Sequence, residues 1–245
     1  MLDLLRVELL KVRRSLALAM MVVIPLFVVL LTTAMLLKRH QLGAMSGRVW
    51  TGYMTANLAI WCSFMLPLYI ALVTGLLNGH EHKNQTWRLM LTLPVSQPAL
   101  YATKLLLAWL FVAGANLVLA AALTLVVSVL GLAGADTGVA FDYPLWKGLA
   151  GVTAIILPVL AIQHAVSWRY ANLVAPLATG IVGSMGIMQI GSSQYWAYYP
   201  WSWPMMYVMG SNPDHRAQAL QLGAGVGAAL CGATILYLGK RAIRT

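Results

Sequence analysis

Charged residues are scarce in this chain of 245 residues. Asp, Glu, Lys and Arg make up 9% of it, whereas a soluble domain carries roughly 25%. Hydrophobic residues reach 60%, and the mean hydropathy is +0.78. Such a composition excludes an ordinary soluble domain, whose surface needs many more charges. It predicts an all-α integral membrane protein.

Cysteines and phosphate-binding motifs are also scarce. Cys62 and Cys231 both lie within apolar runs, so no disulfide framework is expected. The pattern G-x-x-x-x-G-K-[ST], whose backbone cradles nucleotide phosphates, does not occur. No cofactor is therefore expected on this chain, and any ATP that drives it would bind, with Mg²⁺, to a separate ATPase chain.

The sequence contains long apolar runs. A bilayer core of about 30 Å needs roughly 20 helical residues, so each such run predicts one transmembrane helix. We expect a single membrane domain over residues 1–245 with six spans, at approximately residues 15–37, 54–78, 105–132, 148–166, 171–190 and 217–239. Residues 191–216 are crowded with Pro, Gly, Trp and Tyr, which predicts an interfacial or re-entrant segment before the last span.

Basic residues predict the orientation. If the N-terminus is cytoplasmic, six spans place eleven Lys and Arg residues inside and five outside, which fits the positive-inside rule with both termini in the cytoplasm. Lys38, Arg39 and Arg48 are exceptions, because all three fall in the first outer loop. The basic residues are spread over several loops, so the net charge of +10 indicates membrane topology rather than nucleic-acid binding.

The first fourteen residues, MLDLLRVELLKVRR, form an amphipathic pattern. Leu2, Leu5, Leu9 and Val12 share one helical face, from which Arg6 is turned away. The pattern predicts a helix in the cytoplasmic interface, its basic side chains near anionic head groups. A simple cytoplasmic lead-in to the first span is the alternative.

Residues 79–104, between the second and third expected spans, are longer than a turn requires. They include apolar side chains such as Trp87, Leu91 and Leu93, which are costly to leave in water. Ser96 can cap a new helix with Pro98 in its first turn, and that helix would run through Lys104 into the third span. The segment is therefore interpreted as a docking surface for a soluble partner.

These features together resemble the ABC-2 type transporter permeases. The stretches TWRLMLTLPVS and YYPWSWP look closest to the small permeases of bacteriocin and lantibiotic immunity and of multidrug export. In that family the loop between spans two and three forms a coupling helix that seats in the ATPase. The positions that match the family pattern are Glu81, Thr86, Trp87, Leu91, Pro94 and Lys104.

The resemblance implies an assembly in a bacterial inner (cytoplasmic) membrane. Its expected partners are two ABC ATPase subunits, a second permease that is identical or related, and the lipid bilayer, with no nucleic acid. The expected ATPase-coupling residues are Glu81, Thr86, Trp87, Met90, Leu91, Leu93 and Pro94. Of these, Met90 and Leu93 are apolar neighbours of the matching positions. The expected outer gate or interface consists of Trp196, Tyr199, Pro200, Trp201 and Trp203.

Three other patterns have simpler interpretations. His80, Glu81 and His82 diverge on a helix and offer one carboxylate, so no metal site is expected. The many methionines are interpreted as apolar filling rather than copper ligands. Small residues allow close helix packing, within the subunit or between subunits, at Gly180, Gly183, Gly186, Gly223 and Gly227.

The sequence therefore predicts a non-enzymatic permease subunit of an ATP-driven exporter. The expected spans contain His164 as their single ionisable side chain, which argues against intramembrane catalysis and against ion-coupled transport. An uncharged pathway suits an amphipathic or apolar substrate such as a peptide, lantibiotic or drug. The alternative is a non-transporting membrane scaffold or immunity protein that sequesters a ligand.

Overall fold

The computed structural model describes residues 2–39, 41–45, 47–83, 96–191, 193–210 and 212–242. Within these ranges the chain forms helices and no strands, which confirms the all-α membrane class. Four of the described helices are long and apolar enough to cross a bilayer, and one bent pair makes a fifth candidate. The apolar helix α10 (Val174–Ile190) has only 17 residues, so the count of six spans stays a prediction.

The first half of the chain forms an N-terminal helix, a long helix and a helical rod with an internal irregularity. These elements are α1 (Leu2–Val12), α2 (Leu16–Arg39), the short η1 (Leu42–Ala44), α3 (Gly47–Ile60), the π-helical turn η2 (Trp61–Met65) and α4 (Leu66–Lys83). The helical segment that contains the second expected span thus begins at residue 47 rather than at residue 54. The mixed polar and apolar residues ahead of the apolar run are helical too.

The next part contains the longest helix and the bent pair. It comprises α6 (Gln97–Leu132), the short α7 (Gly138–Phe141), α8 (Leu145–Ile155) and α9 (Leu157–Arg169). The expected span at residues 148–166 is therefore broken after Ile155, where α8 and α9 meet at 45°. Pro158 lies in the first turn of α9, and its ring and missing N–H prevent a regular helix from continuing through this point.

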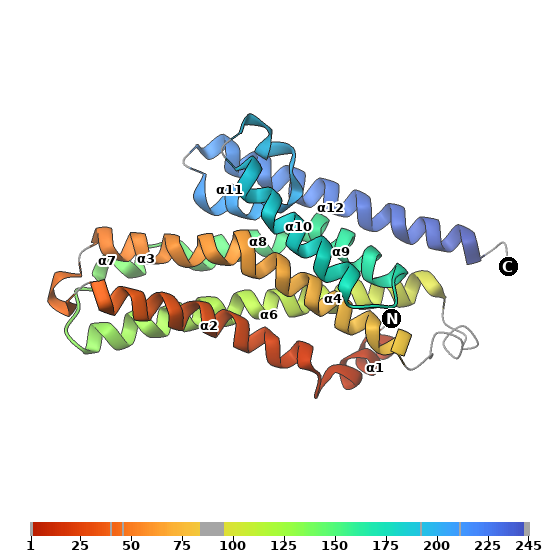
Figure 1. The fold of residues 1–245 in the computed structure, drawn as a ribbon, viewed down its shortest axis with the longest axis horizontal. Helices are drawn as coiled ribbons and strands as arrows, with labels where there is room; N and C mark the ends of the chain where they lie inside the picture. Colours follow the sequence, from red (N-terminus) through yellow and green to blue (C-terminus); the bar gives the residue numbers. More distant parts are fainter. Residues whose placement is uncertain are drawn as a thin grey trace.

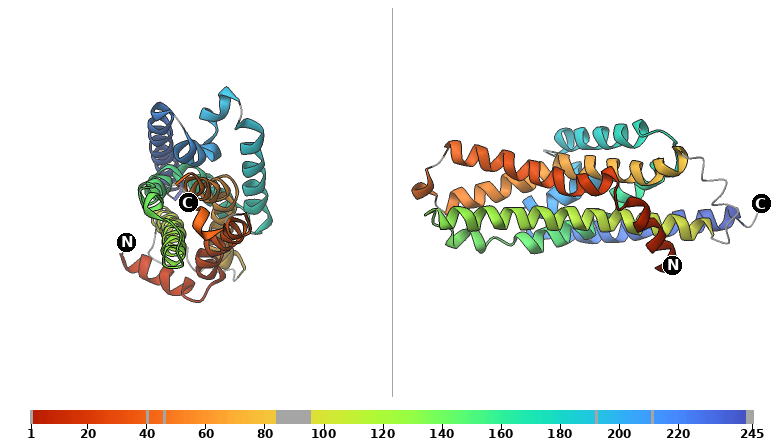
Figure 2. Two further views of the ribbon diagram at one scale, coloured as in Figure 1. Left: turned by 90° about the vertical axis from the view of Figure 1, so that its left-hand side faces the viewer. Right: turned by 90° about the horizontal axis from the view of Figure 1, so that it is seen from below.

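The last part folds back on itself. After α10 come η3 (Gln194–Tyr198), η4 (Pro200–Ser202), α11 (Trp203–Met209) and the long α12 (Pro213–Ala242). Figure 1 and the second view in Figure 2 show that α10 and this returning segment stop short of the bundle end formed by α7 and the start of α3. Residues 193–210 thus form short helical turns, whereas residues 213–216 of the predicted segment already belong to α12.

Helix α6 lies at the centre of the bundle and contacts α1, α2, α4, α8, α9 and α12. A buried polar chain crosses its middle. Trp61 Nε1 donates to Asn116 Oδ1 (2.8 Å), and Asn116 Nδ2 donates to Thr153 Oγ1 (2.8 Å). Since polar groups are costly in an apolar environment unless they are paired, these bonds favour one register of η2, α6 and α8.

Candidate functional site

The candidate site lies at the bundle end that carries both chain termini (Figures 1 and 2). Helix α4 ends there at Lys83, and α6 begins there at Gln97, so both ends of the predicted coupling loop are at this end. The side chain of Glu81 is outside the described part of the chain, although its backbone belongs to α4. The remaining predicted coupling residues also lie outside the described residues, and these are Thr86, Trp87, Met90, Leu91, Leu93 and Pro94.

The start of α6 has the cap that its sequence predicts. Ser96 precedes the helix, and its Oγ accepts a hydrogen bond from the backbone N–H of Ala99 (3.4 Å). Pro98 lies in the first turn, where its missing N–H costs no helical bond. This prediction is confirmed. The helix therefore continues without a break from the loop to Lys104, which it carries into the bundle.

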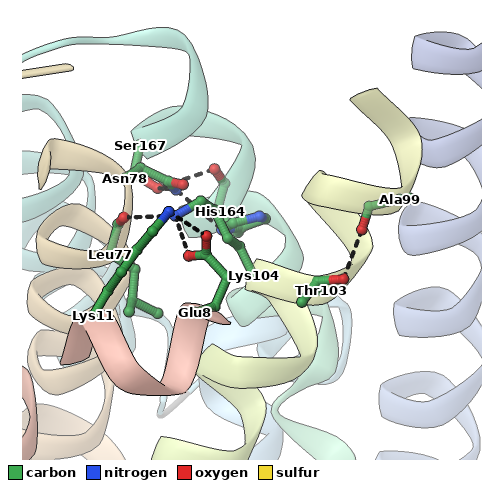
Figure 3. Close-up of polar contacts among 9 residues, drawn as sticks. All are labelled: Glu8, Lys11, Leu77, Asn78, Ala99, Thr103, Lys104, His164 and Ser167. Carbon is green, nitrogen blue, oxygen red and sulfur yellow. Dashed lines mark hydrogen bonds and ion pairs between the residues drawn. The ribbon is translucent and has the colours of Figure 1, made fainter. Parts of the chain in front are cut away.

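A buried ion pair joins α6 to the N-terminal helix (Figure 3). Lys104 Nζ donates to Glu8 Oε2 at 2.7 Å, and both side chains are only 1% exposed. The same Nζ donates to the backbone oxygen of Leu77 in α4 at 3.1 Å. Lys104 therefore connects three elements, namely α1, the last turns of α4 and the first turns of α6.

The other carboxylate oxygen of Glu8 is also bonded. Lys11 Nζ donates to Glu8 Oε1 at 2.6 Å from the next turn of α1. Taking charges out of water is expensive, and the cost is offset only where hydrogen bonds satisfy the charged atoms, as they do around this carboxylate. The arrangement holds α1 against the bundle while the exposed Arg6 and Arg13 stay outside it.

A second polar cluster lies between α4 and α9. Asn78 Nδ2 donates to Nδ1 of His164 (3.1 Å) and to Oγ of Ser167 (2.7 Å), and all three side chains are buried. The other ring nitrogen of His164, Nε2, has no hydrogen-bond partner among the described residues. The ring of Tyr101 lies 4.4 Å from the His164 ring, centroid to centroid. His164 of α9 thus contacts both α4 and α6, close to the ion pair of Glu8 and Lys104 (Figure 3).

The predicted outer-gate residues fold onto α10. Tyr199 Oη donates to the backbone oxygen of Gly183 (2.8 Å), and its ring stacks on Trp201 at 5.5 Å. Burial raises the pKa of Tyr199 above its usual value, so the phenol remains a neutral donor. Pro200, which lies between Tyr199 and Trp201 in the sequence, is the first residue of η4. The geometry fixes this part of the segment against one helix.

Two further gate residues stabilise the turns themselves. Trp203 Nε1 donates to the backbone oxygen of Ala197 (2.9 Å). Ser202 Oγ donates to the backbone oxygens of Trp196 and Tyr199. The ring of Trp196 packs edge-on against His215 at the start of α12 (5.9 Å). The segment is therefore held by its own hydrogen bonds as well as by α10.

The five glycines expected to allow close packing all have close neighbours within this chain. A Cβ at Gly180 would lie 2.7 Å from the Cβ of Ala71, so α10 approaches α4 there. Gly183 and Gly186 instead receive the rings of Trp201 and Tyr199. Gly223 and Gly227 let α12 pass close to the break between α8 and α9, where Ile155 and Leu157 are the neighbours.

Sequence reasoning did not single out Glu8, Asn78 or Asn116. The buried pair that the structure describes joins Glu8 of the N-terminal helix to Lys104. One signal was available, because Glu8 shares the helical face of the buried Val12 and is an acidic residue on an apolar face. Its partner lies far along the chain and has no local signature.

Comparison with known proteins gives one match. A family model described as "ABC-2 family transporter protein" matches residues 4–187, from α1 to near the end of α10. The matched range ends before residues 195–203, so the narrower branch suggested by the aromatic stretch stays a prediction. Neither a curated protein nor a solved structure matches the chain.

Proposed function

The chain belongs to the ABC-2 family of transporter proteins, and on this premise we propose that it is the permease half of an ATP-driven exporter. As a member of that family it is a membrane-spanning subunit that works with an ABC ATPase. The proposal adds a direction, outward, and a substrate class, amphipathic or apolar molecules such as peptides, lantibiotics or drugs. A second permease, identical or related, would complete the pathway.

The buried ion pair between Glu8 and Lys104 is the observation that carries the proposed mechanism. Any force on residues 84–95 is applied to the ends of α4 and α6, and Lys104 ties both ends to α1. A movement of the ATPase against this loop would therefore move three elements together. ATP and Mg²⁺ would bind to the ATPase chain, since this sequence has no phosphate-binding loop.

The membrane part of the bundle supports an uncharged pathway. Between α2, α4 and α10 lies an apolar groove of about 570 Å³ whose lining includes Phe27, Phe64, Leu68 and Leu177. None of the described residues that line it is charged, which favours cargo that partitions into the bilayer over a small ion. The aromatic segment at residues 195–203 lies beyond α10 and would act as the outer gate of this pathway.

The positions of the chain ends support the proposed orientation. Figure 1 shows α1, the ends of α4 and α12 and the start of α6 at one end of the bundle, where the ATPase would dock. Both termini would then lie in the cytoplasm of a bacterial cell. The excess of Lys and Arg in the segments at this end agrees with such an orientation.

Reconstitution tests the function. The chain and its ATPase, co-expressed and placed in proteoliposomes, should move an amphipathic fluorescent peptide across the bilayer only when ATP and Mg²⁺ are supplied. An ATPase variant that binds but does not hydrolyse ATP is the matched control. Retention of the peptide by the permease without ATP-dependent movement would instead favour a scaffold or immunity protein.

A further inference from the structure

An open groove of about 430 Å³ runs between α2 and α3, at the bundle end opposite the chain termini. Its walls are mostly apolar and include Met35 and Leu36 from α2 and Val49, Ala56 and Ile60 from α3. Gly52 also lines the groove, and a Cβ built there would meet no atom within 4 Å. The groove thus has unfilled space in its wall, between two helices that are candidates to cross a bilayer.

The two hydroxyl groups of the wall, those of Thr32 and Tyr53, are already hydrogen-bonded to neighbouring side chains. Tyr53 Oη is hydrogen-bonded to Thr33 Oγ1 (2.8 Å), and Thr32 Oγ1 donates to Asn57 Oδ1 (2.8 Å). Satisfied hydroxyls offer little to a polar ligand. The body of the groove is therefore suited to a hydrocarbon chain rather than to a sugar or a nucleotide.

Two arginines line the same groove. Arg39 is the last residue of α2 and Arg48 is the second residue of α3, and both side chains are exposed. Neither makes an ion pair with an acidic side chain in the part of the chain that the structure describes. Arg39 and Arg48 are two of the five basic residues that the predicted topology places outside, so the positive-inside pattern gives no reason for them.

We propose that this groove binds an anionic phospholipid, with one acyl chain along the apolar wall and the phosphate between Arg39 and Arg48. Guanidinium groups bind phosphate oxygens through charge-assisted, often bidentate hydrogen bonds. Basic pockets between transmembrane helices recognise anionic head groups in the same way. The site requires only that α2 and α3 lie in a bilayer, so it does not depend on the direction or cargo of transport.

Lipid retention tests the proposal on the full chain in detergent. The protein is incubated with equal amounts of phosphatidylglycerol and phosphatidylcholine of identical acyl chains, and bound lipid is counted by native mass spectrometry. The wild type should retain phosphatidylglycerol about 30-fold more than phosphatidylcholine, as expected for two basic side chains at a membrane surface. The variant carrying both Arg39→Gln and Arg48→Gln should retain the two lipids equally.

Two further variants separate the site from general surface charge. Lys38→Gln with Lys147→Gln removes two exposed cations of the same bundle end that do not line the groove, and it should keep the preference. Gly52→Leu adds a side chain at a wall position where a Cβ would meet no atom within 4 Å, and it should lower retention of both lipids. Equal retention by the wild type, or a preference that survives loss of both arginines, would overturn the proposal.

Discussion

Glu8 Oε2 and Lys104 Nζ lie 2.7 Å apart, although 96 positions separate the two residues in the chain. The contact closes the bundle end from which the predicted coupling loop emerges. It gives the N-terminal helix a structural role in addition to the interfacial position that its sequence predicts. Its removal should therefore affect both the stability of the bundle and the communication between α1 and the loop.

Removal of one partner should be costly. Glu8→Gln leaves the Lys104 ammonium buried without its counterion, and breaking a buried pair in this way costs about 3–5 kcal/mol. The melting temperature of the purified protein should fall clearly, whereas Arg6→Gln, which breaks an exposed contact with Asp3, should leave it unchanged. Replacing Glu8 and Lys104 together with leucine should recover much of the loss. Equal effects of Glu8→Gln and Arg6→Gln would contradict this account of the pair.

Asn78 should matter for the cohesion of α4 and α9. Asn78→Ala removes the donor to His164 and Ser167, and a buried acceptor left without a partner costs about 1–3 kcal/mol. Thermal unfolding in detergent measures the change. Ser128→Ala is the matched control, because that hydroxyl bonds only to the backbone of its own helix. If the two variants unfold at the same temperature, the hydrogen bonds that Asn78 donates contribute nothing to stability.

The aromatic segment should be sensitive to a single methyl group on α10. A Cβ at Gly183 would lie 2.3 Å from Trp201 Nε1, so Gly183→Ala should displace the segment and alter transport while the complex still assembles. Gly225→Ala, where nothing lies within 4 Å, should behave as the wild type. Trp196→Ala and Trp201→Ala should likewise alter transport without loss of assembly. Normal transport in all of these variants would reduce the segment to a membrane anchor.

Cysteine labelling should show the topology. The natural Cys62 is buried and Cys231 is half-buried, so a cysteine-free background is a modest change. Single cysteines at Gln85 and Thr245 should react with a membrane-impermeant maleimide only from the cytoplasmic side, and one at Thr137 only from outside. Labelling at position 245 from outside would contradict the arrangement of six spans.

The sequence predicted the features that depend on local patterns. Long apolar runs gave the membrane class, and Ser96 with Pro98 located the start of α6. Pro158 permits a bend within the expected span at residues 148–166, but the 45° break between α8 and α9 is seen only in the structure, where Gly223 and Gly227 of α12 pack against it. The burial of Glu8 and the hydrogen bond from Tyr199 to Gly183 of α10 were missed, since each depends on a partner distant in the chain.

Residues 80–104 are proposed to couple this permease to its ATPase, and co-purification of the two proteins tests this proposal most directly. Leu91→Asp should detach the ATPase, because a carboxylate would be buried unpaired at the contact. Gln85→Asp adds the same charge at a polar position of the same loop and should keep the ATPase bound. Glu81→Ala should leave the complex assembled but uncouple ATP turnover from transport. If the Leu91→Asp complex retains its full complement of ATPase and transports normally, the loop is not the coupling element.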